Sequence, residues 1–366
     1  MKFTKLSLVA ILAVSSAFAG GEIDCNSDTT ISGKAVGYYY TDDTVDLFDE
    51  KSSQLGTAVT LDVSHKLLDG ITANFSAVGY ANLLDDGGYM ESSETGAFFN
   101  VANITATFGD TTLIAGRQLI DSPMFGSFDW LLAQSSFEAY TVVNKSVADL
   151  TLVGTYVRQH RAFNAGDTWT DLTDINDGNN YAVGAVYGAG DITANLWYYN
   201  IDAATYTQVY ADAGYDFGVA KVEAQIAATD YDAGDDSTAY ALKASTELSG
   251  FNLSAAVSMV TDRAAGYVDR DGFYTSSWNR FASDAAAAND DTLSWKVGAS
   301  TEISGINAEA SFAGYGDEGS ELDLIVGYNP TSSVSLGAVY SMTDYDTATS
   351  ATDEVNAFEL FATYSF

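Results

Sequence analysis

Cysteine and proline are nearly absent from this sequence, and it has no long apolar run. The 366 residues include one cysteine, Cys25, and two prolines, Pro123 and Pro330. A single cysteine excludes an intrachain disulfide, so packing and hydrogen bonds must hold the fold together. Scarce proline, together with 32 glycines and 23 tyrosines, favours long strands over helices or disordered segments.

Basic residues are scarce as well. The chain has 15 Lys and Arg against 50 Asp and Glu, which gives a formal net charge of -35 at pH 7. Nucleic-acid binding is excluded, because phosphate contacts need clustered Lys and Arg. An acidic protein of this kind attracts cations instead.

Residues 1–19 have the pattern of a secretory signal peptide. Two lysines precede the apolar residues 6–14, and Ala17-Phe18-Ala19 supplies the small residues of a cleavage site. The apolar stretch is shorter than the roughly 20 residues that a transmembrane helix needs. We therefore expect cleavage after Ala19 and one exported domain over residues 20–366.

Apolar and polar residues alternate along most of the chain. In "LSWKVGASTEI", residues 293–303, apolar Leu293, Trp295 and Val297 occupy one face and Ser294 and Lys296 the other. Such two-faced segments are about 9 to 11 residues long, which is the length of a tilted strand that crosses a bilayer. We count eighteen of them, beginning near residues 30, 55, 71, 97, 111, 137, 150, 180, 192, 205, 219, 238, 251, 292, 306, 321, 334 and 356.

The connections alternate between short and long. Short links such as Ser249-Gly250 and Ser304-Gly305 are typical of tight hairpins, whereas most of the intervening links, for example residues 261–291, are longer and acidic. This predicts an all-β fold: a transmembrane antiparallel up-and-down barrel of about eighteen strands with short periplasmic turns and long outer loops. A soluble sandwich has the same period, but its sheets would leave edges to protect.

Aromatic residues cluster near the predicted strand ends. One group lies beside the short turns, as an interfacial girdle would: Phe108, Tyr187, Tyr215, Phe217, Phe251, Tyr328, Tyr364 and Phe366. A second group lies nearer the long loops and could form the opposite belt: Tyr38, Tyr40, Tyr80, Trp197, Tyr199, Tyr315 and Tyr340. The last strand ends in "FATYSF", and we expect it to pair with the first strand and close the ring. Its Tyr364 and Phe366 resemble the terminal signature by which outer-membrane barrels are recognised for insertion.

One long connection is apolar instead of acidic. Residues 115–143 include Phe125, Phe128, Trp130 and Leu132, which would be costly to expose together to water. We therefore expect residues 121–136 to fold into the lumen as a constriction loop.

At this connection the sequence resembles the OprD-like outer-membrane porins and the related major outer membrane proteins of epsilon-proteobacteria. Three short matches carry the resemblance: Gly116-Arg117-Gln118, then Pro123 and Phe125, then Ser136-Phe137-Glu138. The resemblance implies an outer-membrane channel whose third outer loop forms the constriction, either a homotrimer or a loosely associated monomer. Its expected surroundings are the lipid bilayer with lipopolysaccharide, and its expected assembly partner is the outer-membrane barrel assembly machinery.

Charged residues at predicted inward positions suggest which solutes pass. The inward set is Lys34, Asp62, Lys221, Glu223, Lys243, Glu247, Lys296, Glu302, Glu309, Asp323 and Glu359. Because acids outnumber bases, we expect a porin for ions and small hydrophilic solutes that prefers cations. At the constriction we expect Asp121, Asp129 and Glu138 to face Arg117, with Phe125 and Trp130 narrowing the passage.

Three alternatives stay open. A substrate-specific channel for small organic solutes would have the same barrel, and a surface adhesin would use the long loops, notably residues 261–291. An enzyme would need a nucleophile and a base, but His65 and His160 lie on different strands and have no partner motif nearby. The acid-rich Asp269 to Gly272 and Asp232 to Asp236 lack EF-hand spacing, so we predict no metal site, no cofactor and no catalytic residue.

Overall fold

The computed structural model describes residues 23–26, 28–84, 95–128, 132–163, 165–175, 178–270, 272–279, 292–345 and 354–366. Within these residues all strands belong to one sheet of 20 strands. β1 (Ile23–Asn26) and β9 (Thr170–Asp171) are short additions, paired with β2 and β8 respectively. The other eighteen strands form a closed antiparallel barrel, as the sequence predicts. No helix among the described residues is long and apolar enough to cross a membrane.

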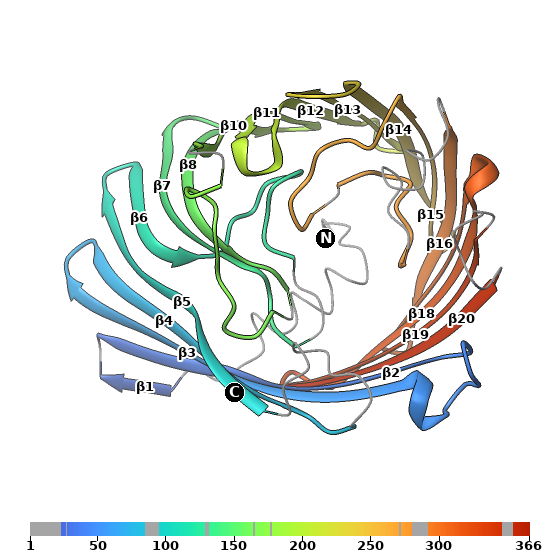
Figure 1. Cartoon of the computed structure of the whole chain (residues 1–366), viewed down its shortest axis with the longest axis horizontal. Coiled ribbons are helices and arrows are strands. Elements are labelled where there is room, and N and C mark those ends of the chain that lie inside the picture. The colour runs from blue at the N-terminus through green and yellow to red at the C-terminus, as the bar shows by residue number, and fades with distance from the viewer. Residues whose placement is uncertain are drawn as a thin grey trace.

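The eighteen strands follow one another around the ring in chain order (Figure 1). Their bounds are β2 (Thr29–Asp42), β3 (Ser53–Leu68), β4 (Ile71–Asn82), β5 (Thr95–Phe108), β6 (Thr111–Gln118), β7 (Ser136–Val147), β8 (Leu150–Arg161), β10 (Asn180–Ala189), β11 (Ile192–Ile201), β12 (Tyr206–Asp216), β13 (Lys221–Tyr231), β14 (Ser237–Leu248), β15 (Phe251–Thr261), β16 (Leu293–Ile303), β17 (Ile306–Tyr315), β18 (Gly319–Thr331), β19 (Val334–Tyr345) and β20 (Glu354–Ser365). Three 3-10 turns complete the described elements: η1 (Glu50–Ser52), η2 (Asp202–Ala204) and η3 (Gly316–Glu318).

The last strand closes the ring, which confirms the expected pairing. β20 pairs with β19 on one side and with β2 on the other, from Lys34 opposite Ser365 to Asp42 opposite Ala357. Beyond β20, Phe366 and Gly33 exchange two backbone hydrogen bonds of 2.8 and 2.9 Å. Closure leaves the sheet without a free edge along this seam.

Short turns join the strands at one end of the barrel. Ser249 and Gly250 have φ of 53° and 83°, and Ser304 and Gly305 have φ of 53° and 82°. Two successive positive φ values suit the right-handed twist of the flanking strands in a two-residue hairpin. The Ser-Gly pairs therefore form the tight turns that the sequence predicts.

Side chains alternate between an apolar outer face and a more polar inner face. On β16, Leu293, Trp295 and Val297 are exposed on the outside, whereas Ser294 is fully buried within the barrel. The outer faces of the other strands carry similar exposed apolar residues, among them Leu324, Val326 and Leu360. An apolar exterior around a closed barrel is the surface that a transmembrane barrel presents to lipid.

The two aromatic groups lie mostly on different faces. The group beside the short turns faces outward: Phe108, Tyr187, Tyr215, Phe217, Phe251, Tyr328 and Tyr364 are all exposed. Most of the second group does not form the predicted outer belt, because Tyr38, Tyr80, Trp197, Tyr199 and Tyr315 are buried inside. Tyr340 stands opposite the exposed Leu324 and faces outward as predicted. The buried rings pack against connections that fold into the barrel.

Candidate pore constriction

Two connections from the long-loop end cross the interior of the barrel (Figure 1). The first joins β6 to β7, and its described residues, 119–128 and 132–135, are what we call the constriction loop. The second follows β15, and its described residues, 262–270 and 272–279, are what we call the strap. The sequence predicts the first insertion but not the second.

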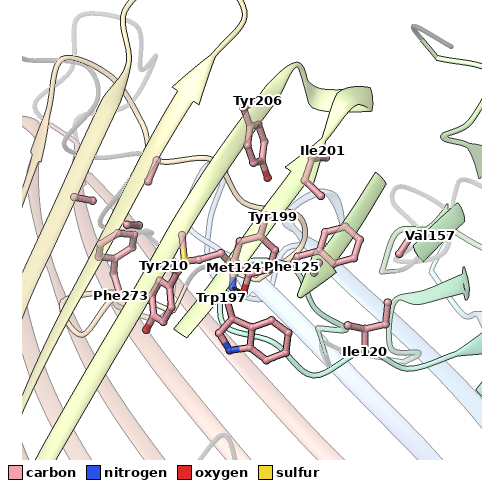
Figure 2. Close-up of a cluster of buried hydrophobic side chains, with 14 of the residues drawn as sticks. Ile120, Met124, Phe125, Val157, Trp197, Tyr199, Ile201, Tyr206, Tyr210 and Phe273 are labelled. Atoms are coloured by element: carbon pink, nitrogen blue, oxygen red, sulfur yellow. Dashed lines mark hydrogen bonds between the residues drawn. The ribbon is translucent and has the colours of Figure 1, made fainter. Parts of the chain in front are cut away.

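The constriction loop packs on the inner wall through apolar side chains. Met124 and Phe125 are fully buried and belong to one cluster with Trp197, Tyr199 and Tyr210 of β11 and β12 (Figure 2). Further along the loop, Leu132 is fully buried in a separate cluster with side chains of β2 to β5. The loop therefore rests on two separate parts of the inner wall, as its apolar composition predicts.

Polar contacts fix the end of the constriction loop. Asn100 of β5 accepts hydrogen bonds from Ser136 Oγ at 2.6 Å and Arg161 Nε at 3.0 Å, and its own amide donates to the carbonyl of Gln134 at 3.1 Å. The Arg161 side chain is fully buried and its guanidinium also lies 4.4 Å from the centroid of the Phe98 ring. Because these buried polar groups bond to one another, the loop end is held in one position.

The strap follows the inner wall across many strands. Gln208 of β12 donates to the carbonyl of Gly266 at 2.7 Å, and Gln225 of β13 donates to the carbonyl of Gly272 at 3.0 Å. Further on, the Tyr315 hydroxyl of β17 donates to the carbonyl of Thr275 at 3.0 Å. Burial raises the pKa of the Tyr274 phenol on the strap, so this group stays neutral.

The far end of the strap lies on three buried carboxylates. The backbone N–H of Trp278 donates to Asp323 at 3.2 Å and that of Asn279 donates to Glu321 at 2.7 Å. The Trp278 indole N–H donates to Glu359 at 2.6 Å. Buried carboxylates need such donors, because an unsatisfied charge in a low-dielectric site is costly.

The strap and the constriction loop are joined to each other. Phe125 and Val268 form a parallel β-bridge, and the Val268 N–H donates to the carbonyl of Met124 at 3.0 Å. Next to it, Arg270 forms an ion pair with Asp121, whose carboxyl side chain is 90% exposed. The two insertions therefore act as one constriction inside the barrel.

The structure contradicts the predicted arrangement of charges around Arg117. Arg117 stands opposite Ala102 and Glu138 in the sheet, and Ala102 stands opposite Phe75, which is exposed on the outer face. Directly paired residues of antiparallel strands share a face, so Arg117 and Glu138 project outward. The Arg117 guanidinium lies 4.2 Å from the centroid of the Trp169 ring, and the cation beside Asp121 is Arg270 instead.

The structure describes most of the other predicted site residues. Asp129 and Trp130 lie outside the described residues. Phe125 lies in the constriction loop, but its ring is fully buried against the inner wall and so does not face the passage as predicted. The register places the whole predicted inward set on the face opposite the exposed apolar side chains: Lys34, Asp62, Lys221, Glu223, Lys243, Glu247, Lys296, Glu302, Glu309, Asp323 and Glu359. Tyr364 and Phe366 share the outer face, with ring centroids 6.1 Å apart.

Sequence reasoning missed the strap. It considered Asp269 to Gly272 only as an acid-rich stretch without EF-hand spacing and gave Asp269 and Arg270 no role in the passage. The interpretation of residues 261–291 as a surface loop does not hold for the described residues 262–270 and 272–279, where Ala265, Phe273 and Trp278 are buried. A signal was present, because this segment carries Tyr267, Phe273, Tyr274 and Trp278, as the constriction loop carries its own aromatic residues. The acid-rich composition of the whole link made the segment look like the other surface loops, so its aromatic residues were not taken as a sign of insertion.

The architecture defines a class: it is the fold of bacterial outer-membrane porins. Among solved structures, the outer membrane protein OpdK of Pseudomonas aeruginosa matches with a TM-score of 0.78 and 15% identity, covering 94% of this chain and 100% of its own. A BenF-like porin from Pseudomonas fluorescens Pf-5 matches at 0.76 and 15%, covering 93% and 99%. OccAB2 of Acinetobacter baumannii matches at 0.77 and 12%, covering 92% and 98%.

These matches confirm, at the level of the fold, the OprD-like resemblance seen in the sequence. OpdK has also been solved with vanillate, in a structure that matches with a TM-score of 0.77 at 15% identity. No protein-family model matches the chain, and no curated protein matches it.

Proposed function

We propose that this protein is an outer-membrane porin through which ions and small hydrophilic solutes diffuse passively, with a preference for cations. The observation that carries the proposal is a closed barrel, apolar outside, whose interior is narrowed by two joined insertions. A passage of this kind needs no catalytic group, because its polar side chains replace part of a solute's hydration.

The inner charges support a cation preference. On the inner face of β13 to β20, Glu247, Glu302 and Glu309 accompany Lys243 and Lys296, and acids also outnumber lysines in the whole inward set. At the constriction, the exposed Asp121 carboxylate offsets the charge of Arg270. Fixed negative charge along a narrow passage concentrates cations within roughly 8 Å at physiological salt.

A second candidate is a channel for one class of small organic anions. The Arg270 side chain is 42% exposed at the constriction, and Lys221 and Lys243 lie on the inner wall of β13 and β14. Vanillate, with which OpdK was solved, is a suitable probe for this alternative.

The test is reconstitution of the protein in a planar bilayer with a potassium chloride gradient. We expect a reversal potential that shows cation preference, and Asp121→Asn should lower the cation-to-anion permeability ratio by roughly twofold, because Arg270 then lacks its counter-charge. Glu138→Gln is the matched control, since Glu138 lies on the outer face. An anion-selective reversal potential with block by vanillate would favour the second candidate, and the absence of any current would reject both.

The surroundings of the barrel complete the proposal. We expect it in the bacterial outer membrane, in contact with lipopolysaccharide, after delivery by the barrel assembly machinery. We also expect a homotrimer, which is one of the two states that the resemblance to OprD-like porins implies. Crosslinking of the protein in isolated outer membranes would test the trimer, and a crosslinked species no larger than one chain would contradict it.

A further inference from the structure

His160 of β8 joins the barrel wall directly to the strap. Its Nε2 lies 2.6 Å from Oδ2 of Asp269, and the two side chains are only 14% and 10% exposed. The imidazole stacks on the Phe137 ring with centroids 4.8 Å apart and planes inclined by 19°. The ring is therefore fixed in position and aimed at the strap.

Asp269 lies at the point where the strap meets the constriction loop. The residue before it, Val268, bonds to Met124, and the residue after it, Arg270, pairs with Asp121. Asp269 itself has a φ of 58°, in the left-handed region, and the Arg270 N–H donates to the carbonyl of Val268 at 2.7 Å, so the backbone turns tightly at Asp269. One short segment thus touches the wall and the constriction loop together.

We propose that His160 is a positioning residue: its protonation tightens the strap against the wall, so the opening of the pore depends on pH. This inference rests on the proposed channel function. It assigns to His160 a role that acts through Asp269 on the shape of the passage, not on the solute itself.

The charged groups around the imidazole support this direction. From the strap it faces Asp269, followed in sequence by Arg270, which pairs with Asp121 of the constriction loop. From β7 it faces the apolar Phe137, and its partner on β9 is the uncharged Thr170. On β8 itself the neighbouring Arg161 is directed to Asn100 and Gln134. The carboxylate of Asp269 is thus the acid that the imidazole contacts.

Protonation changes the strength of this contact. Histidine side chains change charge between about pH 5 and 8. A protonated imidazole makes an ion pair with Asp269, and charge-assisted bonds are roughly twice as strong as neutral ones, more so away from water. Loss of the proton leaves a weaker hydrogen bond, so the strap should leave its position against the wall more often at pH 8 than at pH 5.

Single-channel recording of the full chain between pH 5 and 8 tests the effect on the pore. We expect the frequency of current fluctuations to rise about three- to tenfold from pH 5 to pH 8 in the native protein, since 1.4 kcal/mol is a factor of ten. His160→Gln and Asp269→Asn should fluctuate at a rate that is high and independent of pH. The matched control is His65→Gln: His65 lies beside a short turn, bonded to Thr29 Oγ1 at 2.7 Å, and its variant should keep the native pH profile.

A second measurement follows the mobility of the strap without recording any current. A spin label at Tyr267→Cys, in a Cys25→Ser background, should be less mobile at pH 5 than at pH 8, and this difference should vanish in His160→Gln. Label mobility that depends on pH equally with and without His160 would overturn the inference. Absence of current in the native protein would reject the channel function, whereas the label spectra decide the role of His160 by themselves.

Discussion

At the scale of single residues, the face of a strand decides the role of a side chain. Arg117 and Glu138 were expected in the passage, but the register places both on the outer wall, and Asp121 pairs with Arg270 from a segment about 150 positions away in sequence. Strand β6 lacks a strong alternation of apolar and polar residues, so its sequence does not determine which face is inward.

Gly33 provides a residue-scale prediction at the seam between β2 and β20. A Cβ at this position would lie 2.5 Å from the Thr60 carbonyl oxygen and 2.6 Å from the Phe366 ring. Gly33→Ala should therefore lower the free energy of unfolding by about 1–3 kcal/mol, the usual cost of overpacking. Equilibrium urea unfolding in lipid vesicles would measure it.

Gly37→Ala is the control for that experiment. Gly37 lies on the same strand, and no atom lies within 4 Å of the position that a Cβ would take there, so alanine should be tolerated. Equal stability losses in the two variants would show that the close approach of Phe366 is not the cause.

At the scale of elements, the strap is an inserted segment whose polar contacts replace those of a regular strand. Its carbonyls and N–H groups bond to side chains of the wall, including Gln208, Gln225 and Asp323. A segment without secondary structure of its own can remain inside a protein only when such partners exist.

Tyr315→Phe tests this anchoring. The Tyr315 hydroxyl is buried and lies 2.6 Å from Ser277 Oγ and 3.0 Å from the Thr275 carbonyl, so its removal should destabilise the strap by about 1 kcal/mol. We expect noisier single-channel currents at unchanged barrel content. Tyr328→Phe, on the lipid-facing side of β18, is the control and should behave like the native protein. If the current noise of Tyr315→Phe were as low as that of Tyr328→Phe, the Tyr315 hydroxyl would not anchor the strap.

At the scale of the whole molecule, the barrel depends on the separation of its two faces. Val297 lies near the middle of β16, 47% exposed on the outer face, and Ser300 of the same strand faces inward. Val297→Arg should cost about 2–4 kcal/mol, because the charge would enter the hydrocarbon.

Ser300→Arg is the matched variant on the inner face. Its guanidinium would face the water-filled side and stand opposite Glu309 of β17, so we expect little loss of stability. Unfolding in vesicles would compare the two variants. A larger loss for the inner variant than for the outer one would contradict the assignment of faces.

The alternation of residue types by itself determined the strand count, the closure and the outer face. Val297 and Leu324 lie outward and Lys296 and Asp323 inward because a strand has a period of two and only one face meets lipid. Local turn chemistry, such as Ser249-Gly250, determined the tight hairpins.

The tertiary structure alone decided what lies inside the barrel. The composition of the constriction loop indicated an insertion, but the contacts of Asp121 with Arg270 and of His160 with Asp269 join segments more than 100 positions apart. No periodicity specifies such pairs, because they depend on how two irregular loops meet after the ring has closed.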